Sequence, residues 1–232
     1  MEHPILIAGA TGGVGQNLVA QMRAAKRPLR AFVRDMQRGR RLFGPEPDLV
    51  VGDTRQTDTL PVALENVRMV ICATGTRQAV GDDDPQHVDY EGVCNLVTAS
   101  VKAGVERFVL VSTMRVTDPN HPLNEFGRVL DWKLKGENVL RESGLNYTIV
   151  RPGGLTDDPG ACKGLRLGQG DAMRTGLITR SDVAEICLRV LDIPTTYNAT
   201  FEVINNDDTP RVTDWAAFFS ELVPDHELNT NG

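Results

Sequence analysis

The chain has 232 residues, of which 41% are hydrophobic and 24% are charged. That length and hydrophobic content suffice for one sizeable core, or for one core with a small appended lobe. The formal net charge is −6 and the sequence pI is about 5.3. Because nucleic-acid binding depends on clustered cations that contact phosphates, this acidic balance argues against a nucleic-acid partner.

Cysteine usage and hydropathy indicate the compartment. Cys72, Cys94 and Cys187 lie in apolar runs, Cys162 lies apart, and no two cysteines form a CxxC pair. This pattern is typical of free thiols in a reducing compartment and predicts no metal site. The first apolar run ends at a glycine, and no run approaches the ~20 residues of a membrane helix, so we expect neither signal peptide nor membrane span. We therefore expect a cytoplasmic protein, or one of an organelle stroma if the sequence is a mature form.

Short apolar runs alternate with amphipathic stretches along the first two thirds of the chain. Continuous apolar runs are typical of strands buried on both faces, and they predict strands at 5–10, 29–35, 48–53, 68–75, 107–113 and 146–154. Apolar residues at helical spacing predict helices at 14–25, 57–66, 88–104 and 125–143. This alternation predicts a doubly wound parallel α/β sheet of the Rossmann type.

The pattern loosens after Gly154. Residues 155–176 are rich in glycine and charge, and predict a loop or lobe over the sheet instead of a strand–helix unit. The elements expected after it are a helix at 181–192 capped by Ser181, a strand at 199–206 and a helix at 212–223 capped by Thr213.

These patterns divide the chain into a nucleotide-binding core and a smaller C-terminal part. We expect the core to span residues 1–154. Residues 155–223 are expected to form a substrate lobe that sends elements back to the core. Residues 224–232 are polar and terminal, which predicts a frayed, flexible tail.

The segment GATGGVGQ lies between the first predicted strand and the first predicted helix. Its glycines Gly9, Gly12 and Gly15 follow a G-x-x-G-x-x-G spacing. A tight turn at this point lets backbone N–H groups at the helix start bind a pyrophosphate, which bulkier side chains would block. A glycine-rich turn without a ligand is the alternative, but the strand–turn–helix context favours a dinucleotide site.

The second predicted strand ends in FVRD, which places Arg34 where an NAD-selective site usually has a carboxylate. A cation there suits a 2′-phosphate, so the sequence favours NADP(H) over NAD(H). Arg38, Arg40 and Arg41 follow, and we interpret them as a solvated basic loop. Asp53, after the third strand, is either an acceptor for the adenine amino group or a simple turn carboxylate.

The ordered set GATGGVG, FVRD, ICATG, VDYEGVCNLVTASVKAGVERFVLVST, SGLNYTIVRPGGL and TRSDVA resembles the atypical short-chain dehydrogenase/reductases. The similarity is to their NAD(P)H-binding, NmrA-like group, which includes plant and cyanobacterial chloroplast-type members. It covers about residues 4–222 of the chain. The resemblance implies a Rossmann fold with a small C-terminal substrate lobe and a bound NADP(H).

Carried over position by position, the resemblance also implies roles for individual residues. The phosphate loop would consist of Gly9, Thr11, Gly12, Gly13, Val14 and Gly15. The 2′-phosphate and adenosine contacts would come from Arg34, Asp53, Thr54, Ala73, Thr74 and Gly75. The nicotinamide would be enclosed by Ser112, Lys133, Pro152, Gly153, Gly154 and Leu155. Ser112 at the reaction edge and Lys133 on the nicotinamide ribose are the candidate catalytic residues.

One position departs from the family. Members that reduce carbonyls commonly use a Y-x-x-x-K pair, whose i,i+4 spacing puts the proton-donating phenol beside the lysine on one helix face. Four residues before Lys133 stands Val129, which exchanges no proton. A register with Lys135 and Asp131 supplies no tyrosine either, and we reject it because Lys133 matches the family pattern.

Three hypotheses accommodate this departure. In the first, a reductase takes its proton from another group, and the candidates are Ser112, Thr113, His121, Tyr147 and water. In the second, the substrate needs no enzymic acid, as with an activated carbon–carbon double bond or a quinone-like ring. The leading prediction is an NADPH-dependent oxidoreductase acting on an unidentified small molecule. The third hypothesis, a non-catalytic NADP(H)-sensing or assembly protein with protein partners, is the alternative.

Other polar residues receive structural interpretations. His87 and His121 are isolated and expected on loops or the surface, and Tyr90 is expected to pack at a helix start. Arg180 and Asp182 in TRSDVA are expected to fix the C-terminal lobe to the sheet. The acidic run at 82–84 predicts a mobile loop near the substrate mouth, without a catalytic role.

Overall fold

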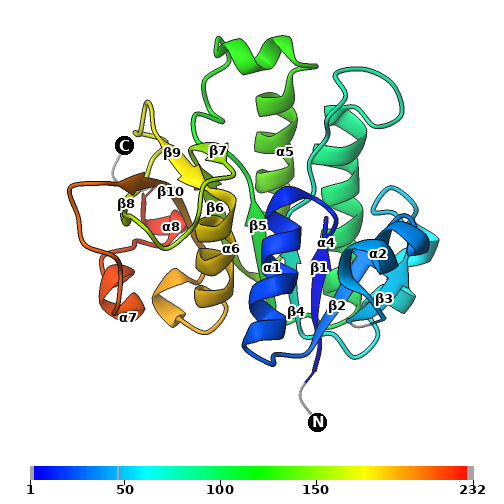
Figure 1. Ribbon diagram of the computed structural model, residues 1–232. Coiled ribbons are helices and arrows are strands. Elements are labelled where there is room, and N and C mark those ends of the chain that lie inside the picture. The colour runs from blue at the N-terminus through cyan, green and yellow to red at the C-terminus, as the bar shows by residue number, and fades with distance from the viewer. Residues whose placement is uncertain (1–2, 46, 229–232) are drawn as a thin grey trace.

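A single large sheet organises the computed structural model, which describes residues 3–45 and 47–228 (Figure 1). Within those residues, eight strands pair in the order β3-β2-β1-β4-β5-β6-β10-β8. They are β1 (Ile5–Ala8), β2 (Leu29–Val33), β3 (Asp48–Val51), β4 (Met69–Cys72), β5 (Arg107–Val111), β6 (Asn146–Pro152), β8 (Gly164–Gly168) and β10 (Ala199–Asn206). All neighbouring pairs are parallel except β10 with β8. The predicted doubly wound α/β fold is confirmed.

Helices cover both faces of this sheet. They are α1 (Gly13–Ala24), α2 (Met36–Phe43), α3 (Leu60–Ala63), α4 (Gly92–Lys102), α5 (Val129–Arg141), α6 (Arg180–Arg189), α7 (Trp215–Phe218) and α8 (Asp225–Leu228). In Figure 1, α1 and α6 lie in front of the sheet, and α4 and α5 lie behind it. Ile5 and Ile7 of β1 pack into the core beneath α1, whereas Leu6 and Ala8 pack into the core on the opposite face. Burial on both faces explains why the strands are continuous apolar runs.

The strand order reverses direction beside β1. The chain runs from β1 to β2 and β3 on one side, and then returns to β4, β5 and β6 on the other. In open parallel sheets, the loops at such a reversal separate at the carboxyl ends of the strands and leave a crevice for ligands. The turn that follows β1 lies at this point, and it carries the glycines singled out in the sequence.

The basic stretch after β2 is a helix, so its prediction as a solvated loop was wrong. Helix α2 begins after Asp35, whose carboxylate accepts a hydrogen bond from the Arg38 backbone N–H at 3.0 Å. That bond lowers the pKa of Asp35 below its usual value. Phe43 at the end of the helix is buried in the core. A helix this short is stabilised by its N-cap and by packing of its buried face. The many basic residues on its exposed face make the same segment resemble a loop in the sequence.

The segment after Gly154 contains strands that the sequence did not predict. β7 (Gly154–Thr156) pairs in parallel with β9 (Leu177–Thr179) as a small separate ribbon. β8 joins the main sheet as an antiparallel edge strand, with Leu167 opposite Val203 of β10. Its sequence, GLRLG, is short and bounded by glycines, as is common at sheet edges. This segment is therefore recognisable as a strand only through its pairing with β10.

Two predicted helix caps and two predicted helix lengths were also wrong. Helix α6 is capped by Thr179 instead of Ser181, because the Thr179 hydroxyl accepts from the Asp182 N–H at 3.0 Å. Helix α7 is capped by Asp214 instead of Thr213 and ends at Phe218.

The predicted helix at 57–66 consists of a 3-10 turn, η1 (Thr57–Thr59), and the short α3. Other short turns are η2 (Gln86–Glu91, a π-helix), η3 (Pro122–Glu125) and η4 (Pro194–Thr196).

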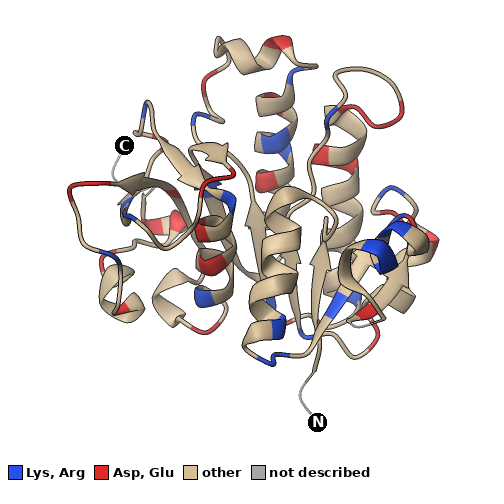
Figure 2. Cartoon of the chain, viewed as in Figure 1, with Lys and Arg blue, Asp and Glu red and all other residues tan. Residues whose placement is uncertain are grey.

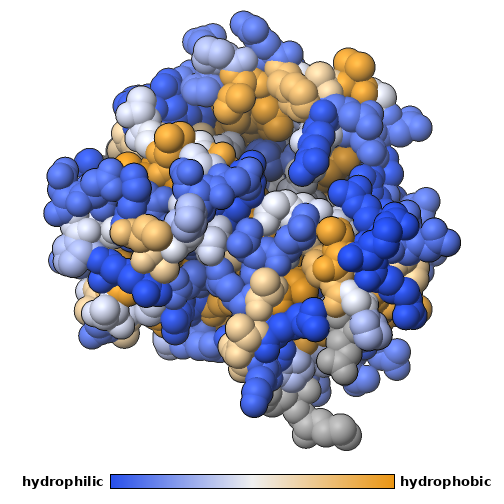
Figure 3. Space-filling model, viewed as in Figure 1, coloured by the Kyte–Doolittle hydropathy of each residue, from blue (hydrophilic) through white to orange (hydrophobic). Residues whose placement is uncertain are grey.

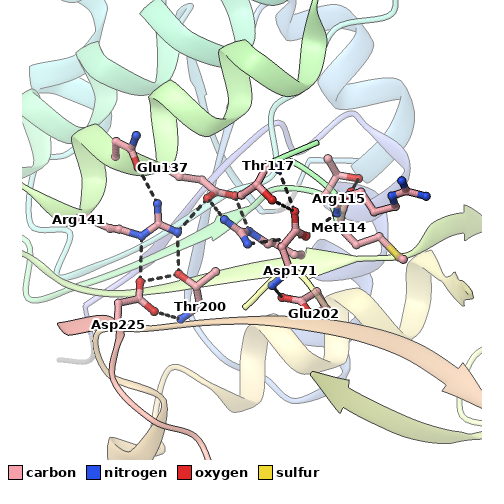
Figure 4. Close-up of polar contacts among 12 residues, drawn as sticks. Met114, Arg115, Thr117, Glu137, Arg141, Asp171, Thr200, Glu202 and Asp225 are labelled. Carbon is pink, nitrogen blue, oxygen red and sulfur yellow. Dashed lines mark hydrogen bonds and ion pairs between the residues drawn. The ribbon is translucent and has the colours of Figure 1, made fainter. Parts of the chain in front are cut away.

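The chain end is anchored further than predicted. Residues 224–228 were expected to be frayed, but α8 lies there and Asp225 is buried. Its carboxylate accepts hydrogen bonds from the Thr200 N–H at 2.7 Å, the Tyr147 hydroxyl at 2.9 Å and Arg141 Nε at 2.9 Å. These contacts tie the end of the chain to β6, β10 and α5, and Figure 4 shows those of Asp225 with Arg141 and Thr200. The rest of the predicted tail, 229–232, lies outside the described residues.

Asp225→Ala is expected to lower the free energy of unfolding by about 2–4 kcal/mol, because it leaves the Arg141 guanidinium and the hydroxyls of Tyr147 and Thr200 without their buried acceptor. Urea unfolding followed by circular dichroism measures this loss. Asp207→Ala is the control, since Asp207 pairs with Lys163 on the surface and such pairs contribute only about 0–1 kcal/mol. Equal losses in the two variants would contradict the anchoring role of Asp225.

Candidate functional site

A cleft of about 280 Å³ lies at the carboxyl ends of β1, β2 and β4. Figure 3 shows the surface hollowed there, between the loop before α4 and the segment that carries β7 and β9. Many of the residues selected from the sequence line this cleft together: Gly9, Thr11, Gly12, Arg34, Asp53, Thr54, Ala73, Thr74 and Gly75. Residues that the sequence did not select also line it: Phe32, Arg38, Gly52, Thr76, Arg77, Gln78, Asp83 and Val88. The carboxyl edge of the sheet therefore brings the predicted phosphate-loop and adenosine residues to one place.

The glycine loop is built from backbone packed on backbone. Gly9 has φ +82°, and a Cβ on it would lie 2.5 Å from the Ala73 carbonyl oxygen. A Cβ on Gly15 would lie 2.2 Å from the Gly9 carbonyl oxygen. Only glycine allows these approaches, which hold the end of β1, the end of β4 and the start of α1 together.

The first turn of α1 faces the cleft without a side-chain partner. The helix begins at Gly13, its N-cap Gly12 supplies no side-chain hydrogen bond, and no acidic residue lies in its first turn. The N–H groups of a first helical turn lack intrahelical acceptors and carry the positive end of the helix dipole. The geometry therefore suits a bound phosphate group.

Above Gly13 lies a cation that the sequence interpretation placed elsewhere. A Cβ on Gly13 would meet Arg180 Cδ at 2.4 Å, so the Arg180 side chain covers the glycine loop. Arg180 Nη1 also pairs with the exposed Asp157 at 2.9 Å. Arg180 thus links the C-terminal segment to the loop as well as to the sheet. Val14 and Gly15 lie beneath, buried in the start of α1.

Two arginines and two aspartates lie together at the end of the cleft next to β2 and β3. Arg34 Nη1 lies 2.8 Å from Asp83 Oδ1 and 4.0 Å from Asp53 Oδ2. Arg55 contacts the same two carboxylates, at 2.8 Å for Asp83 and 2.7 Å for Asp53. Burial acts to raise the pKa of Asp53, but the hydrogen bonds from Arg55 outweigh it and lower that pKa. Asp53 is therefore an ionised acceptor already engaged by Arg55.

The acidic run at 82–84, predicted as a loop near the substrate mouth, contacts the basic residues at the β2 end of the cleft. Asp83 is turned onto Arg34 and Arg55, and the Asp82 carbonyl accepts a hydrogen bond from Arg55. Asp84 instead binds the His87 N–H at 3.0 Å at the start of η2. Figure 2 shows acidic residues in the loop before α4 and basic residues on α2. Attraction between opposite charges draws the loop to the β2 end of the cleft.

A second, much smaller pocket of about 10 Å³ adjoins the end of β5 and contains both candidate catalytic residues. Lys133 Nζ lies 2.6 Å from Asp89 Oδ1, and the Asp89 side chain is only 1% exposed. Ser112 lines the same pocket, and Thr74 lines this pocket and the larger cleft. The two pockets therefore share a wall at the end of β4.

Asp89 is not among the residues predicted from the sequence, although its neighbour Tyr90 is. The π-helix η2 turns Asp89 toward α5, and Gly136 lets α5 approach closely, since a Cβ there would lie 2.9 Å from the Asp89 carbonyl oxygen. Tyr90 stacks on Trp132 with ring centroids 5.6 Å apart, as its structural interpretation predicted. An acidic residue at a helix start within VDYEG was the available signal, but its partner lies 44 residues away in sequence.

The Ser112 hydroxyl is buried and finds no hydrogen-bond partner among the described residues. Its backbone is fixed by the Ser112 N–H, which donates to the Val150 carbonyl at 2.8 Å. A buried hydroxyl left without a partner costs about 1–3 kcal/mol, so such a group is typical of a ligand site.

The other candidate proton sources are less suitably placed. The Tyr147 hydroxyl donates to Asp225 near the amino end of β6, away from both pockets, and its burial raises the pKa of Tyr147. His121 lies before η3, where its ring accepts from the Leu123 N–H at 3.2 Å.

Two further residues near the pockets supply no acid or base of the usual kind. Burial raises the pKa of Cys72, which lies at the end of β4, so this cysteine is a thiol and not a thiolate. Val129 begins α5 one turn before Lys133.

Pro152, Gly153, Gly154 and Leu155 lie outside the lining of both pockets. They lead from β6 into β7, at the same edge of the sheet. The Gly153 N–H donates to the Val203 carbonyl at 3.0 Å, and the Gly154 N–H donates to the Gly176 carbonyl at 2.9 Å. This segment therefore joins the sheet to the β7–β9 ribbon.

A buried polar network beneath Lys133 fixes α5 on the sheet. Glu137 follows Lys133 by one helical turn, and Arg151 of β6 donates to it through Nε at 3.0 Å and Nη2 at 2.6 Å. Asp171 accepts from the Thr117 N–H at 2.8 Å, and Glu202 accepts from the Asp171 N–H at 3.0 Å (Figure 4). The network connects α5 with the loops that follow β5 and β8.

The described residues contain neither a recognisable metal site nor a membrane span. Within 3–45 and 47–228, no group of three or more His, Cys, Asp and Glu side chains is arranged to hold a metal ion. No helix in the same residues is long and apolar enough to cross a membrane.

The fold, the cleft at the point where the strand order reverses, and the glycine loop together define a Rossmann-type dinucleotide-binding protein. The chain matches the family described as NAD(P)H-binding over residues 9–194, and it belongs to that family. The predicted cofactor class is thereby confirmed, as is the resemblance to short-chain dehydrogenase/reductases of the chloroplast-type group.

Among its relatives is an uncharacterized chloroplastic protein of Arabidopsis thaliana, 32% identical over 94% of this chain and 75% of that protein. Sanguinarine reductase of Eschscholzia californica is 29% identical over 94% of this chain and 95% of that protein. A putative NAD-dependent epimerase/dehydratase from Bacillus halodurans superposes with a TM-score of 0.83 at 29% identity, covering 95% of this chain and 100% of its own. A short-chain dehydrogenase/reductase from Veillonella parvula, solved in complex with NADP, shares the fold at 19% identity and a TM-score of 0.72, covering 92% and 100%.

Gly15→Ala is expected to lower the free energy of unfolding by about 1–3 kcal/mol and to weaken NADPH binding about tenfold or more, because its Cβ meets only backbone that must shift. Thermal unfolding and fluorescence titration with NADPH measure the two effects. Gly13→Ala is the matched control for stability, since its Cβ meets only the flexible Arg180 side chain. Equal destabilisation by the two substitutions would refute the backbone-packing argument.

Proposed function

We propose that this protein is an NADPH-dependent reductase of a small organic molecule, and that Lys133 and Ser112 act in place of the missing tyrosine. The observation that carries the proposal is the small pocket in which an ion-paired lysine and an unpartnered buried hydroxyl lie beside the cofactor cleft. Groups of this kind, buried and incompletely satisfied, are typical of reaction sites.

The residues present fit NADP(H). The glycine loop and the first turn of α1 would hold the pyrophosphate, and Arg34 with Arg38 would hold the 2′-phosphate, since both arginines line the cleft. Lys133 would bind the nicotinamide ribose, with the unpartnered Ser112 hydroxyl nearby. The bound cofactor supplies hydride, and the protein positions it against the substrate.

Lys133 has hydrogen-bond donors beyond the one that Asp89 accepts. An ammonium group has three N–H donors, and Asp89 accepts one of them at 2.6 Å. The remaining donors are free to bind a ribose hydroxyl and a substrate oxygen. Ser112 would donate a further hydrogen bond to the substrate oxygen, and the Lys133 ammonium would supply the proton that a tyrosine supplies in other members.

Residues 155–223 are proposed as the substrate-selecting lobe on a cofactor-binding core formed by residues 1–154. Leu155 and Leu177, on β7 and β9, are 37% and 62% exposed at the edge of the sheet that carries the cleft. Figure 3 also shows hydrophobic residues gathered above the hollow, over η3 and the start of α5. An apolar rim of this kind favours an apolar substrate with few polar groups.

Arg34→Ala is expected to weaken NADPH binding about 10–100-fold, because a charge-assisted bond to phosphate contributes about 1.5–3 kcal/mol. NADH binding should change by less than about threefold, since NADH lacks the 2′-phosphate. Isothermal titration with both cofactors measures the difference. Arg40→Ala is the control, because Arg40 is on α2 but does not line the cleft. Equal losses for NADPH and NADH would rule out the 2′-phosphate assignment.

Lys133→Gln is expected to lower the turnover of NADPH about 100-fold or more, the usual contribution of a positioned acid. The assay screens carbonyls, enones and quinones for NADPH oxidation at 340 nm and then compares the variants on the best substrate. Lys135→Gln, two residues along the same helix and stacked on Trp132 outside the pocket, should stay within about twofold.

Two outcomes would contradict the proposal. If Lys133→Gln and Lys135→Gln had the same turnover, the pocket would not be the reaction site. If the wild-type protein bound NADPH tightly but oxidised it with no member of the panel, the alternative of a non-catalytic NADP(H)-sensing protein would be favoured instead.

A further inference from the structure

The loop between β4 and η2 lies against the cleft and places a carboxylate on the arginine proposed to bind the 2′-phosphate. Asp83 lines the cleft, and its Oδ1 lies 2.8 Å from Arg34 Nη1 and 2.8 Å from Arg55 Nη1. The Thr76 hydroxyl donates to the Asp83 carbonyl, which ties the two ends of the loop together. Asp83 is therefore held in position as the principal anion facing Arg34.

We propose that Asp83 sets the cofactor preference of this protein, by occupying the place on Arg34 that the 2′-phosphate of NADP(H) takes. The inference rests on the proposed role of Arg34 in NADP(H) binding. A 2′-phosphate gains two parallel N–H donors of Arg34, including Nη1, only when Asp83 leaves Nη1, whereas a 2′-hydroxyl does not require that displacement.

Charge and hydrogen-bonding capacity both support this competition. A phosphate monoester carries nearly two negative charges, and a carboxylate within hydrogen-bond distance of the same guanidinium repels it. Arginine binds phosphate best through two parallel N–H donors, and Asp83 takes up the Nη1 group of Arg34. The cation that selects NADP(H) is therefore partly neutralised by a residue of the same chain.

Asp83 has the opposite effect on the binding of NAD(H), which it favours. A ribose 2′-hydroxyl is a donor, and the carboxylate that NAD-selective sites place at the end of the second strand accepts from it. Arg34 follows that strand here, but Asp83 brings a carboxylate to the same place from another loop. With Asp83 on Arg34, the site accommodates a 2′-hydroxyl, and with Asp83 displaced it accommodates a 2′-phosphate.

The loop has a backbone suited to this movement. Gly81 has φ +97°, and a Cβ on it would approach only the Gln78 side chain, at 3.9 Å. Val80 beside it is 78% exposed, so little apolar packing holds the tip. Asp83 is thus joined to the protein mainly through polar contacts, which a competing phosphate can replace.

The test measures dissociation constants of the full-length protein for NADPH and NADH by titration. Asp83→Asn removes the charge while keeping the shape, and it is expected to tighten NADPH binding about tenfold, the scale of one screened unit charge near the phosphate. NADH binding is expected to stay the same or to weaken by up to about threefold. The preference for NADPH over NADH therefore rises.

Asp82→Asn is the matched control, because it removes an equal charge from the neighbouring residue, whose side chain does not line the cleft. It should leave the ratio of the two dissociation constants unchanged. The proposal is overturned if Asp83→Asn shifts both cofactors equally, weakens NADPH binding, or acts no differently from Asp82→Asn.

Arg34→Ala distinguishes failure of the role of Asp83 from failure of the proposed role of Arg34. If Arg34→Ala lowers the NADPH preference but Asp83→Asn does not raise it, Arg34 binds the 2′-phosphate and the role of Asp83 is disproved. If neither variant changes the preference, the 2′-phosphate lies elsewhere and both assignments fail.

Discussion

The functional part of this protein depends on a contact between three stretches of backbone. Gly9 at the end of β1 lies against the Ala73 carbonyl at the end of β4, and Gly15 of α1 lies against the Gly9 carbonyl. A side chain at either glycine would push these segments apart and lower stability, because the atoms it meets are backbone that must shift. Their close approach aims the first turn of α1 into the crevice where the strand order reverses, and the rest of the cofactor cleft is arranged around that turn.

A second close approach organises the other end of the site. Gly136 lets α5 rest on the π-helix η2, and this brings Lys133 onto the buried Asp89. Beneath it, Glu137 is held by Arg151, so the helix is fixed on the sheet by charge as well as by apolar packing. The glycine-loop cleft and the small pocket proposed as the reaction site are thus supported by different contacts. On the proposed function, this separation would let a family member keep the nucleotide cleft while Val129 stands in the place of a proton-donating tyrosine.

Much of the fold could be predicted from the residues because it follows from local patterns. Continuous apolar runs predicted the parallel strands, and the glycine spacing predicted the turn after β1. The cleft lining includes Arg34 and Asp53, as expected of residues just beyond the carboxyl ends of parallel strands. Helix α2 and strand β8 were missed, because an N-cap with one buried aromatic stabilises the first and pairing with β10 defines the second. Their sequences alone look like polar loops.

The sequence by itself therefore determined the class of protein and its cofactor cleft, since these depend on hydrophobic periodicity and on glycines at fixed spacing. Only the tertiary structure decided which charges meet. Asp89 reaches Lys133, Asp83 reaches Arg34, and Arg180 reaches the glycine loop, each across a long separation in sequence. The physical reason is that an ion pair is selected by distance and burial in the folded chain, and neither quantity is encoded in the local pattern around a charged residue.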